Sequence, residues 1–437
     1  MKKAVFFALV IILMLAGCAE NAQSDIFALP EMPETHSALI QTVEEVRLGG
    51  FEYAEPKSGF SRHPLQLVDL DGDGENEGIV FLRDITETYK TYIYIFEQSD
   101  SVFGLFDIIE GSENEIYTVS YSKLLENGGY ELIVKWGADD EGSHSVTAYT
   151  LTQDGVRKNL SIMAEQFSVS DIDGDGQNEL LAVRKSDGGY FADIYAADGD
   201  EIEKKASIRL SEHKDGKVIR ILSGKISDEK NAAFIERRSD DGIITDVVSG
   251  KDGFFENVIP SGDVCGVSAL CADVNNDGIT ELPQETEKND LSDTDRTYVW
   301  RRVSGGGVLI PTTFTYHSFS DNWYLSMPLD WQSSVFAEKK KIGSERVRID
   351  FFSKEMIDAD EDTYIKAPLF SIYVLTGSNR KNIATEDGEF IISERENMLI
   401  AGKITSEGYL GEKIDEDFIK KAFKNRESDW ASEILFA

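Results

Sequence analysis

Short runs of apolar and aromatic residues, separated by polar turn residues, recur along most of the chain. Residues 91–96, 146–151 and 190–195 are examples, each rich in the β-branched and aromatic side chains that favour strands. Turn residues such as those at 186–189 separate the runs. No stretch between residues 60 and 310 has the period of a helix. An all-β region of this length, with turn signals about every 8–12 residues, predicts a propeller or a sandwich.

The pattern changes after residue 315. Runs at 346–352, 369–375 and 390–392 predict further strands. Asp415 can cap a helix with apolar residues on one face, namely Phe418, Ile419, Ala422 and Phe423. We therefore expect a small α+β domain over 316–437, after a β domain over 37–315. Weak alternation over 40–53 predicts one or two more strands, in either the first or the last sheet of the β domain.

The first residues predict export and lipid anchoring. Lys2 and Lys3 precede an apolar run over 4–15, which suits a signal-peptide core and is too short to span a bilayer. The run ends in Leu15-Ala16-Gly17-Cys18, which resembles the bacterial lipobox. We expect a signal peptide over 1–17, a lipidated Cys18 and a polar tether over 18–36, which would hold the chain on a bacterial cell membrane outside the cytoplasm. An ordinary secretory signal with an incidental cysteine is the alternative.

Three acidic loops share one spacing within the β region, at residues 69–77, 171–179 and 273–281. Each has oxygen-bearing side chains at positions 1, 3, 5 and 9 and a glycine at position 6. The loops start 102 residues apart, and faded copies begin near residues 120 and 223. Half of that spacing is close to one propeller blade, about 40–50 residues. Alternate oxygens on a tight loop suit Ca²⁺, which takes six to eight oxygen ligands, whereas a single such loop could be a solvated turn.

These loops resemble FG-GAP/VCBS repeats, which form integrin-α-like β-propellers with Ca²⁺ in their blade loops. The resemblance implies a mainly β fold, with a propeller of five to seven blades followed by the α+β domain, and up to three structural Ca²⁺ ions. The side-chain ligands that it implies are Asp69, Asp71, Asp73 and Glu77; Asp171, Asp173, Asp175 and Glu179; and Asp273, Asn275, Asp277 and Glu281. The backbone carbonyls of Glu75, Gln177 and Ile279 would complete the three sets. Asn275 replaces a carboxylate, so the third loop is expected to bind most weakly.

The net charge and the cysteine positions give two further expectations, one about partners and one about disulfides. The chain has 44 basic and 80 acidic residues, a formal net charge of −36, so no nucleic-acid partner is expected because phosphate binding needs a basic surface. Cys265 and Cys271 would lie about 20 Å apart on an extended chain, which is beyond disulfide reach. Two buried thiols are expected, and a disulfide across a local bend is the alternative.

The functional prediction is a lipid-anchored, extracytoplasmic module that binds or scaffolds a protein or a glycan. The sequence has no nucleophile elbow, zinc-protease motif or phosphate loop, and no catalytic residue is assigned. An extracytoplasmic polysaccharide-active enzyme on the propeller scaffold is the alternative. Residues 323–331 are similar to the opening of PsbP/Mog1-like domains. That similarity implies a third possibility, an assembly factor for another envelope complex.

Overall fold

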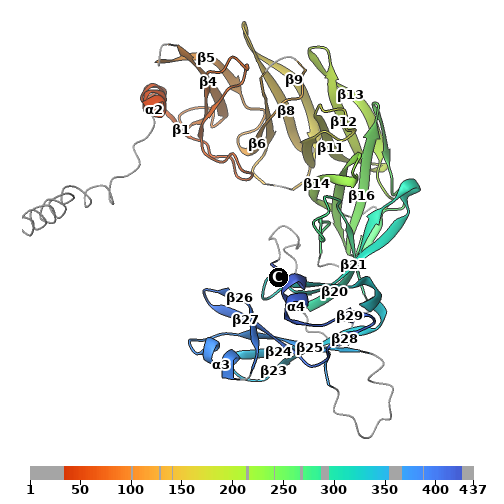
Figure 1. Ribbon diagram of the computed structural model, residues 1–437. Coiled ribbons are helices and arrows are strands. Elements are labelled where there is room, and N and C mark those ends of the chain that lie inside the picture. The colour runs from red at the N-terminus through yellow and green to blue at the C-terminus, as the bar shows by residue number, and fades with distance from the viewer. Residues whose placement is uncertain are drawn as a thin grey trace, which may run out of the picture. The chain divides into compact units, whose positions relative to one another are not determined.

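The computed structural model describes residues 34–99, 102–126, 129–139, 141–212, 216–240, 242–265, 269–286, 295–353, 367–386 and 388–425. The expected signal peptide, Cys18 and most of the expected tether lie outside these residues, as does the side chain of Cys265. Cys271 is a free and buried thiol. The described chain is mainly β, as predicted, and consists of small antiparallel sheets (Figure 1). None of its helices combines the length and the apolar character needed to cross a bilayer.

Five sheets follow one another along the chain. The first comprises β1 (Phe51–Tyr53), β2 (Leu65–Val68), β3 (Glu77–Asp84), β4 (Thr91–Ser99) and β5 (Val102–Glu110). The second comprises β6 (Ile116–Ser122), β7 (Glu131–Trp136), β8 (His144–Thr152) and β9 (Gly155–Ala164). The third comprises β10 (Gln166–Ser170), β11 (Glu179–Ser186), β12 (Gly189–Asp198) and β13 (Glu201–Arg209).

The last two of the five sheets are also antiparallel. The fourth comprises β14 (Lys217–Ser227), β15 (Lys230–Ser239), β16 (Gly242–Lys251), β17 (Phe254–Asn257) and β18 (Asp263–Cys265). The fifth comprises β19 (Leu282–Glu285), β20 (Asp295–Val303), β21 (Leu309–Ser318), β22 (Trp323–Met327) and β30 (Phe423–Asn425). A short 3-10 helix, η1 (Gly305–Gly307), connects β20 to β21. Apart from β1, β18 and β30, each sheet is a meander of sequence neighbours, which explains the regular spacing of turn residues.

Strands β3, β11 and β15 are each buried on both faces over four consecutive residues. Residues 79–82 of β3, 180–183 of β11 and 232–235 of β15 are all apolar and almost fully buried. Successive side chains of a strand point to opposite faces, so four buried residues in a row require both faces to be covered. Apolar clusters accordingly join the second sheet to the third, the third to the fourth and the fourth to the fifth.

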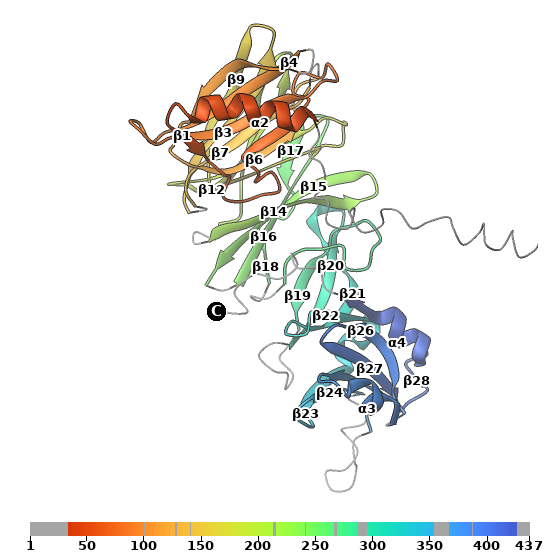
Figure 2. The same cartoon turned by 90° about the vertical axis from the view of Figure 1, so that its left-hand side faces the viewer.

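The start of the described chain differs from the prediction of strands over 40–53. An α-helix, α2 (Glu34–Arg47), precedes β1 and packs on the first sheet (Figure 2). Leu39 and Val43 are four residues apart and fully buried, and such spacing places them on one helix face. This apolar pair outweighs the weak alternation, and only Phe51–Tyr53 forms the expected strand. The helix also takes in the last residues assigned to the tether.

A C-terminal sheet follows the fifth one. It comprises β23 (Val335–Lys341), β24 (Arg346–Ser353), β25 (Phe370–Leu375), β26 (Phe390–Arg395) and β27 (Met398–Ile404). Shorter elements are η2 (Leu329–Ser333), α3 (Arg380–Glu386), the pair β28 (Gly408–Tyr409) and β29 (Glu412–Lys413), and α4 (Glu416–Ala422). Asp415 caps α4 by accepting the N–H of Phe418 at 2.9 Å, as predicted. The expected boundary between residues 315 and 316 lies inside β21, and β22 and β30 belong to the same sheet.

The chain divides into two compact units. The first contains the described residues up to Ser120 together with Trp136–Ala138 and Thr150–Arg157. The second contains Tyr121–Lys135, Asp139–Tyr149 and the described residues from Lys158 onward. The loop at 69–77 therefore belongs to the first unit, and the loops at 171–179 and 273–281 belong to the second.

Candidate metal centres

We call residues 69–77, 171–179 and 273–281 the first, second and third loops. The first loop connects β2 to β3, and the second connects β10 to β11. A short bridge between Ala272 and Glu281 closes the third loop. The first and second loops therefore each close a β-hairpin, and the isolated bridge brings the two ends of the third loop together.

Backbone conformation explains the glycines of the loops. Position 6 has φ of +95° at Gly74, +93° at Gly176 and +85° at Gly278. Position 4 also lies in the left-handed region, with Gly72 and Gly174 at +80° and +81° and Asn276 at +60°. Glycine enters this region without strain, and asparagine enters it more readily than most residues. The sequence therefore specifies two tight turns within each loop.

The first residue of each loop organises the backbone. In the second loop Asp171 accepts the N–H groups of Gly174 and Gly176 at 2.6 and 3.1 Å. Asp69 accepts the corresponding groups of Gly72 and Gly74 at 2.7 and 3.2 Å. These bonds wrap the backbone around the carboxylate, as alternate inward-facing ligands require.

The structure brings together three of the predicted side-chain ligands in each of two loops. Asp69, Asp71 and Glu77 each offer a carboxylate oxygen, and these oxygens lie within 4.8 Å of one another. Asp171, Asp173 and Glu179 form an equivalent group within the same limit. Three converging carboxylates can hold a hard divalent cation. Both groups are therefore candidate metal centres.

Position 5 is placed differently. Asp73 and Asp175 are outside the two groups and accept the N–H of Glu75 and Gln177 at 2.7 and 2.8 Å. The carbonyls of Glu75 and Gln177, which the resemblance assigns as ligands, follow directly on the same turn. The described geometry thus supports positions 1, 3 and 9 as the convergent set.

The third loop departs from this arrangement because of Asn275. The Asn275 side-chain amide donates to Asp277 at 3.1 Å and to Glu281 at 2.8 Å. Asp273 still accepts from the backbone N–H of Asp277 and Gly278. The amide partly replaces a cation as the partner of these carboxylates, in keeping with the expected weaker third site.

The glutamate at position 9 is buried in every loop. Glu77, Glu179 and Glu281 accept the N–H of position 2 at 2.6, 2.7 and 3.1 Å. Burial raises their pKa, and the neighbouring aspartates raise it further, to about 7 for Glu77 and Glu179 and to about 8 for Glu281. A divalent cation would offset this crowding of negative charge, so the donor set fits such an ion.

A related bond occurs in the second sheet, where the sequence shows no acidic loop. Glu131 is 2% exposed and accepts the N–H of Leu124 at 2.7 Å. The Leu124-to-Glu131 spacing equals that from position 2 to position 9 in the acidic loops. This structural role of the glutamate was not predicted, although a glutamate directly before a buried strand is its signal in the sequence.

Contacts with neighbouring sheets hold the second loop from two sides. Asn231 of the fourth sheet donates to the Asp171 carbonyl at 2.8 Å, and the N–H of Gly253 donates to the Asp173 carboxylate at 3.0 Å. On the other side, Asn178 donates to Ser122 and to the Lys123 carbonyl, both at 3.2 Å. The second loop therefore joins three consecutive sheets. These partners lie far away in the sequence, so the loop pattern could not indicate them.

Comparisons with known proteins do not identify the family. No protein-family model and no curated protein matches the chain. Among solved structures, the Bacillus licheniformis rhamnogalacturonan lyase PL11 is 11% identical with a TM-score of 0.30, over 69% of this chain and 75% of the lyase. The exotype rhamnogalacturonan lyase YesX is 12% identical with a TM-score of 0.25, over 68% of this chain and 60% of the lyase. Similarity this low carries no conclusion about activity.

Proposed function

We propose that this protein is a lipid-anchored, extracytoplasmic scaffold that is stabilised by calcium and binds a protein or a glycan. The observation that carries the proposal is the convergence of Asp69, Asp71 and Glu77, repeated by Asp171, Asp173 and Glu179. A donor set made only of oxygen atoms favours Ca²⁺ over the softer transition metals. In this proposal the five consecutive sheets are propeller-type blades, the lower end of the expected range of five to seven.

The proposed role of the metal is structural. A cation in the second loop would fix Asp171 and Asp173, whose backbone and side chain contact the fourth sheet. The same loop contacts the second sheet through Asn178. Metal binding would thus stabilise the packing between sheets. Extracellular modules commonly bind Ca²⁺ with dissociation constants on the order of 10⁻⁴–10⁻³ M, which suits an extracytoplasmic location.

Calorimetric titration of the full chain tests the metal sites. We expect Ca²⁺ to bind, and Asp71→Ala and Asp173→Ala each to remove one class of site. Asp187→Ala is the matched control, because it removes an exposed carboxylate at a β-turn outside the loops. Failure of the wild type to bind Ca²⁺, or equal binding by all three variants, would refute the calcium part of the proposal.

Lipid anchoring has a separate test. Cells that express the chain are fed a clickable fatty-acid analogue, and the protein is then examined for label. We expect label on the wild type and on Cys271→Ser, in which a buried thiol is replaced. Cys18→Ser should carry no label and should leave the membrane fraction. Label on Cys18→Ser would exclude the proposed anchor.

A further inference from the structure

A cavity of about 610 Å³ lies between the fourth and fifth sheets, within the second compact unit. Its floor is aliphatic and is formed by Ile226, Ile279 and Val303, all of which are buried. Its rim is polar and includes Ser227, Asp228, Lys230, Glu256, Arg302 and Ser304. Cavities of about 300–1,000 Å³ with an apolar base and a few polar groups are the usual sites for small ligands.

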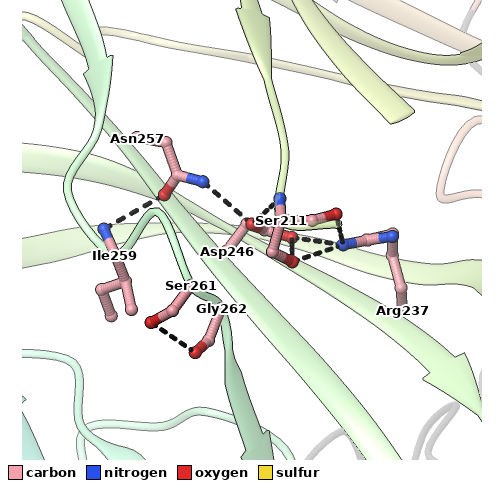
Figure 3. A network of polar contacts seen from close by, with 7 residues as sticks. All are labelled: Ser211, Arg237, Asp246, Asn257, Ile259, Ser261 and Gly262. Atoms are coloured by element: carbon pink, nitrogen blue, oxygen red, sulfur yellow. Dashed lines mark hydrogen bonds and ion pairs between the residues drawn. The ribbon is translucent and has the colours of Figure 1, made fainter. Parts of the chain in front are cut away.

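One wall of the cavity is fixed by a buried polar network, shown in Figure 3. Asn257 lines the cavity and donates to the Asp246 carboxylate at 2.9 Å, while its side-chain oxygen accepts the N–H of Ile259 at 3.1 Å. Asp246 in turn forms an ion pair with Arg237 at 2.7 Å, and both side chains are fully buried. Ser211 donates to the same carboxylate through its N–H and its hydroxyl. The wall is therefore preorganised.

The third loop and the η1 turn form the remaining walls. Ile279 belongs to the third loop, and the next residue, Thr280, donates its N–H to the Lys225 carbonyl at 2.8 Å. Gly307 has φ of +75°, and a Cβ at this position would lie 2.1 Å from the Val258 carbonyl oxygen. Only glycine permits this close approach of two backbones. The cavity shape is thus built into the backbone of both sheets.

Charge on the rim indicates the chemistry of a ligand. Within the described part of the chain, the Arg302 side chain has no hydrogen-bond or ion-pair partner, although acidic residues outnumber basic ones. Lys230 lies 3.7 Å from Glu256, which leaves both groups open to further hydrogen bonds. The rim therefore offers a guanidinium for an anionic oxygen, together with donors and acceptors for hydroxyl groups. A guanidinium binds a carboxylate with two parallel hydrogen bonds.

We propose that this cavity binds an acidic saccharide, with the sugar carboxylate on Arg302 and ring hydroxyls on Lys230, Glu256 and Ser304. The aliphatic floor suits the C–H face of a sugar ring. The inference rests on the proposed function and names the ligand class. A cation in the third loop would fix Ile279 and so support the floor, which makes sugar binding stronger in Ca²⁺ than in a chelator.

Titration calorimetry of the full chain in Ca²⁺ tests the proposal, with digalacturonate and its neutral counterpart galactobiose as probes. We expect digalacturonate to bind at least about tenfold more tightly than galactobiose. Arg302→Ala should abolish the difference and Arg302→Lys should retain part of it. Arg209→Ala is the matched control, because it removes a surface cation of the third sheet that pairs with Glu212. Its affinities should equal those of the wild type.

Each other outcome overturns the inference. Absence of digalacturonate binding, equal affinity for the two sugars, or wild-type behaviour of a folded Arg302→Ala variant would do so. Acetate serves as an additional probe: binding as tight as that of digalacturonate would identify a simple anion site and exclude a saccharide site. Calcium titration of the same sample separates the two proposals, because a protein that binds Ca²⁺ but no sugar retains the scaffold role and loses the cavity assignment.

Discussion

At the scale of single residues, the glutamate at position 9 combines two tasks. In each of the three acidic loops this carboxylate accepts a hydrogen bond from a buried N–H. In the second sheet, Glu131 accepts the N–H of Leu124 in the same way. Only in the first and second loops does the carboxylate at position 9 also converge with two aspartates. The N–H bond is therefore a property of the hairpin, and metal binding is an addition to it. The two tasks can be separated by substitution.

Replacement of Glu131 should destabilise the chain independently of calcium. Glu131→Ala leaves the N–H of Leu124 buried without its acceptor, which costs about 1–3 kcal/mol. Denaturant unfolding in Ca²⁺ and in a chelator should give the same loss. Glu131→Gln keeps an acceptor oxygen and should lose less. Glu179→Ala, by contrast, should lose more in Ca²⁺ than in the chelator, and a calcium-dependent loss for Glu131→Ala would contradict the separation.

A pH effect is expected at Asp84, which ends β3. The N–H and hydroxyl groups of Thr86 and Thr88 donate to its carboxylate at 2.7–2.9 Å, and these bonds hold its pKa well below the ordinary range. The unfolded pKa is about 3.9, so the ionised group contributes stability above about pH 4 and loses it as the pH falls toward the folded pKa.

Melting curves of the wild type and Asp84→Asn should show this effect. We expect the variant to melt at a lower temperature at neutral pH, by an amount that stays constant down to about pH 5. Below about pH 4 the difference should shrink, because only the wild type loses a charge there. A difference that is the same at all pH values would mean that the carboxylate charge is irrelevant to the bonds at Asp84.

The residues of the candidate centres were predictable to the extent that they are local. Spacing within nine residues placed Asp69, Asp71 and Glu77 together because a tight loop turns alternate side chains inward. The same reasoning could not indicate Asn231 and Gly253, which contact the second loop from the fourth sheet. Arg302 and Asn257 line the same cavity although they are 45 residues apart in the sequence. Contacts of this kind depend on sheet packing, which single-sequence patterns do not encode.

At the scale of elements, α2 is the largest departure from expectation. Its apolar side chains pack on the first sheet, where Leu39 contacts a cluster with Val80, Leu82 and Phe96. The side chain of Leu39 lies so near Gly78 that a Cβ there would come within 2.6 Å of it. Only two positions of α2, Leu39 and Val43, are fully buried, so the helical periodicity in the sequence is short. The weak alternation over residues 40–53 obscures it. The strands of the sheets, by contrast, gave long and repeated signals.

The helix is expected to stabilise the first unit. Leu39→Ala removes a fully buried side chain and should cost about 2–5 kcal/mol, measured by circular dichroism during denaturation. Gln41→Ala on the exposed side of the same helix should change stability by no more than about 0.5 kcal/mol. Similar losses for both variants would mean that helix formation, and not its packing on the sheet, supplies the stability.

At the scale of the whole molecule, the acidic loops are distributed over both compact units. The first loop lies in the first unit, and the second and third loops lie in the second unit. Because each unit has its own apolar clusters, each can respond to its own metal centre. A ligand that binds only the folded state stabilises it by about 2.7 kcal/mol at a hundredfold excess over the dissociation constant. Calcium should therefore raise the midpoint temperatures of two thermal transitions, one for each unit, independently of each other.

Scanning calorimetry in Ca²⁺ and in a chelator should resolve these transitions, and Leu39→Ala assigns the one that belongs to the first unit. In Asp71→Ala we expect the calcium-dependent rise of that transition to disappear while the other transition still rises. In Asp173→Ala the transition of the first unit should still rise with calcium. The rise of the other transition should fall to what the third loop alone contributes, which is small because the Asn275 amide already donates to two of its carboxylates. Asp187→Ala should behave as the wild type. If either loop variant lowered both transitions equally, the two units would have to unfold as one, and stabilisation by separate metal centres would be untenable.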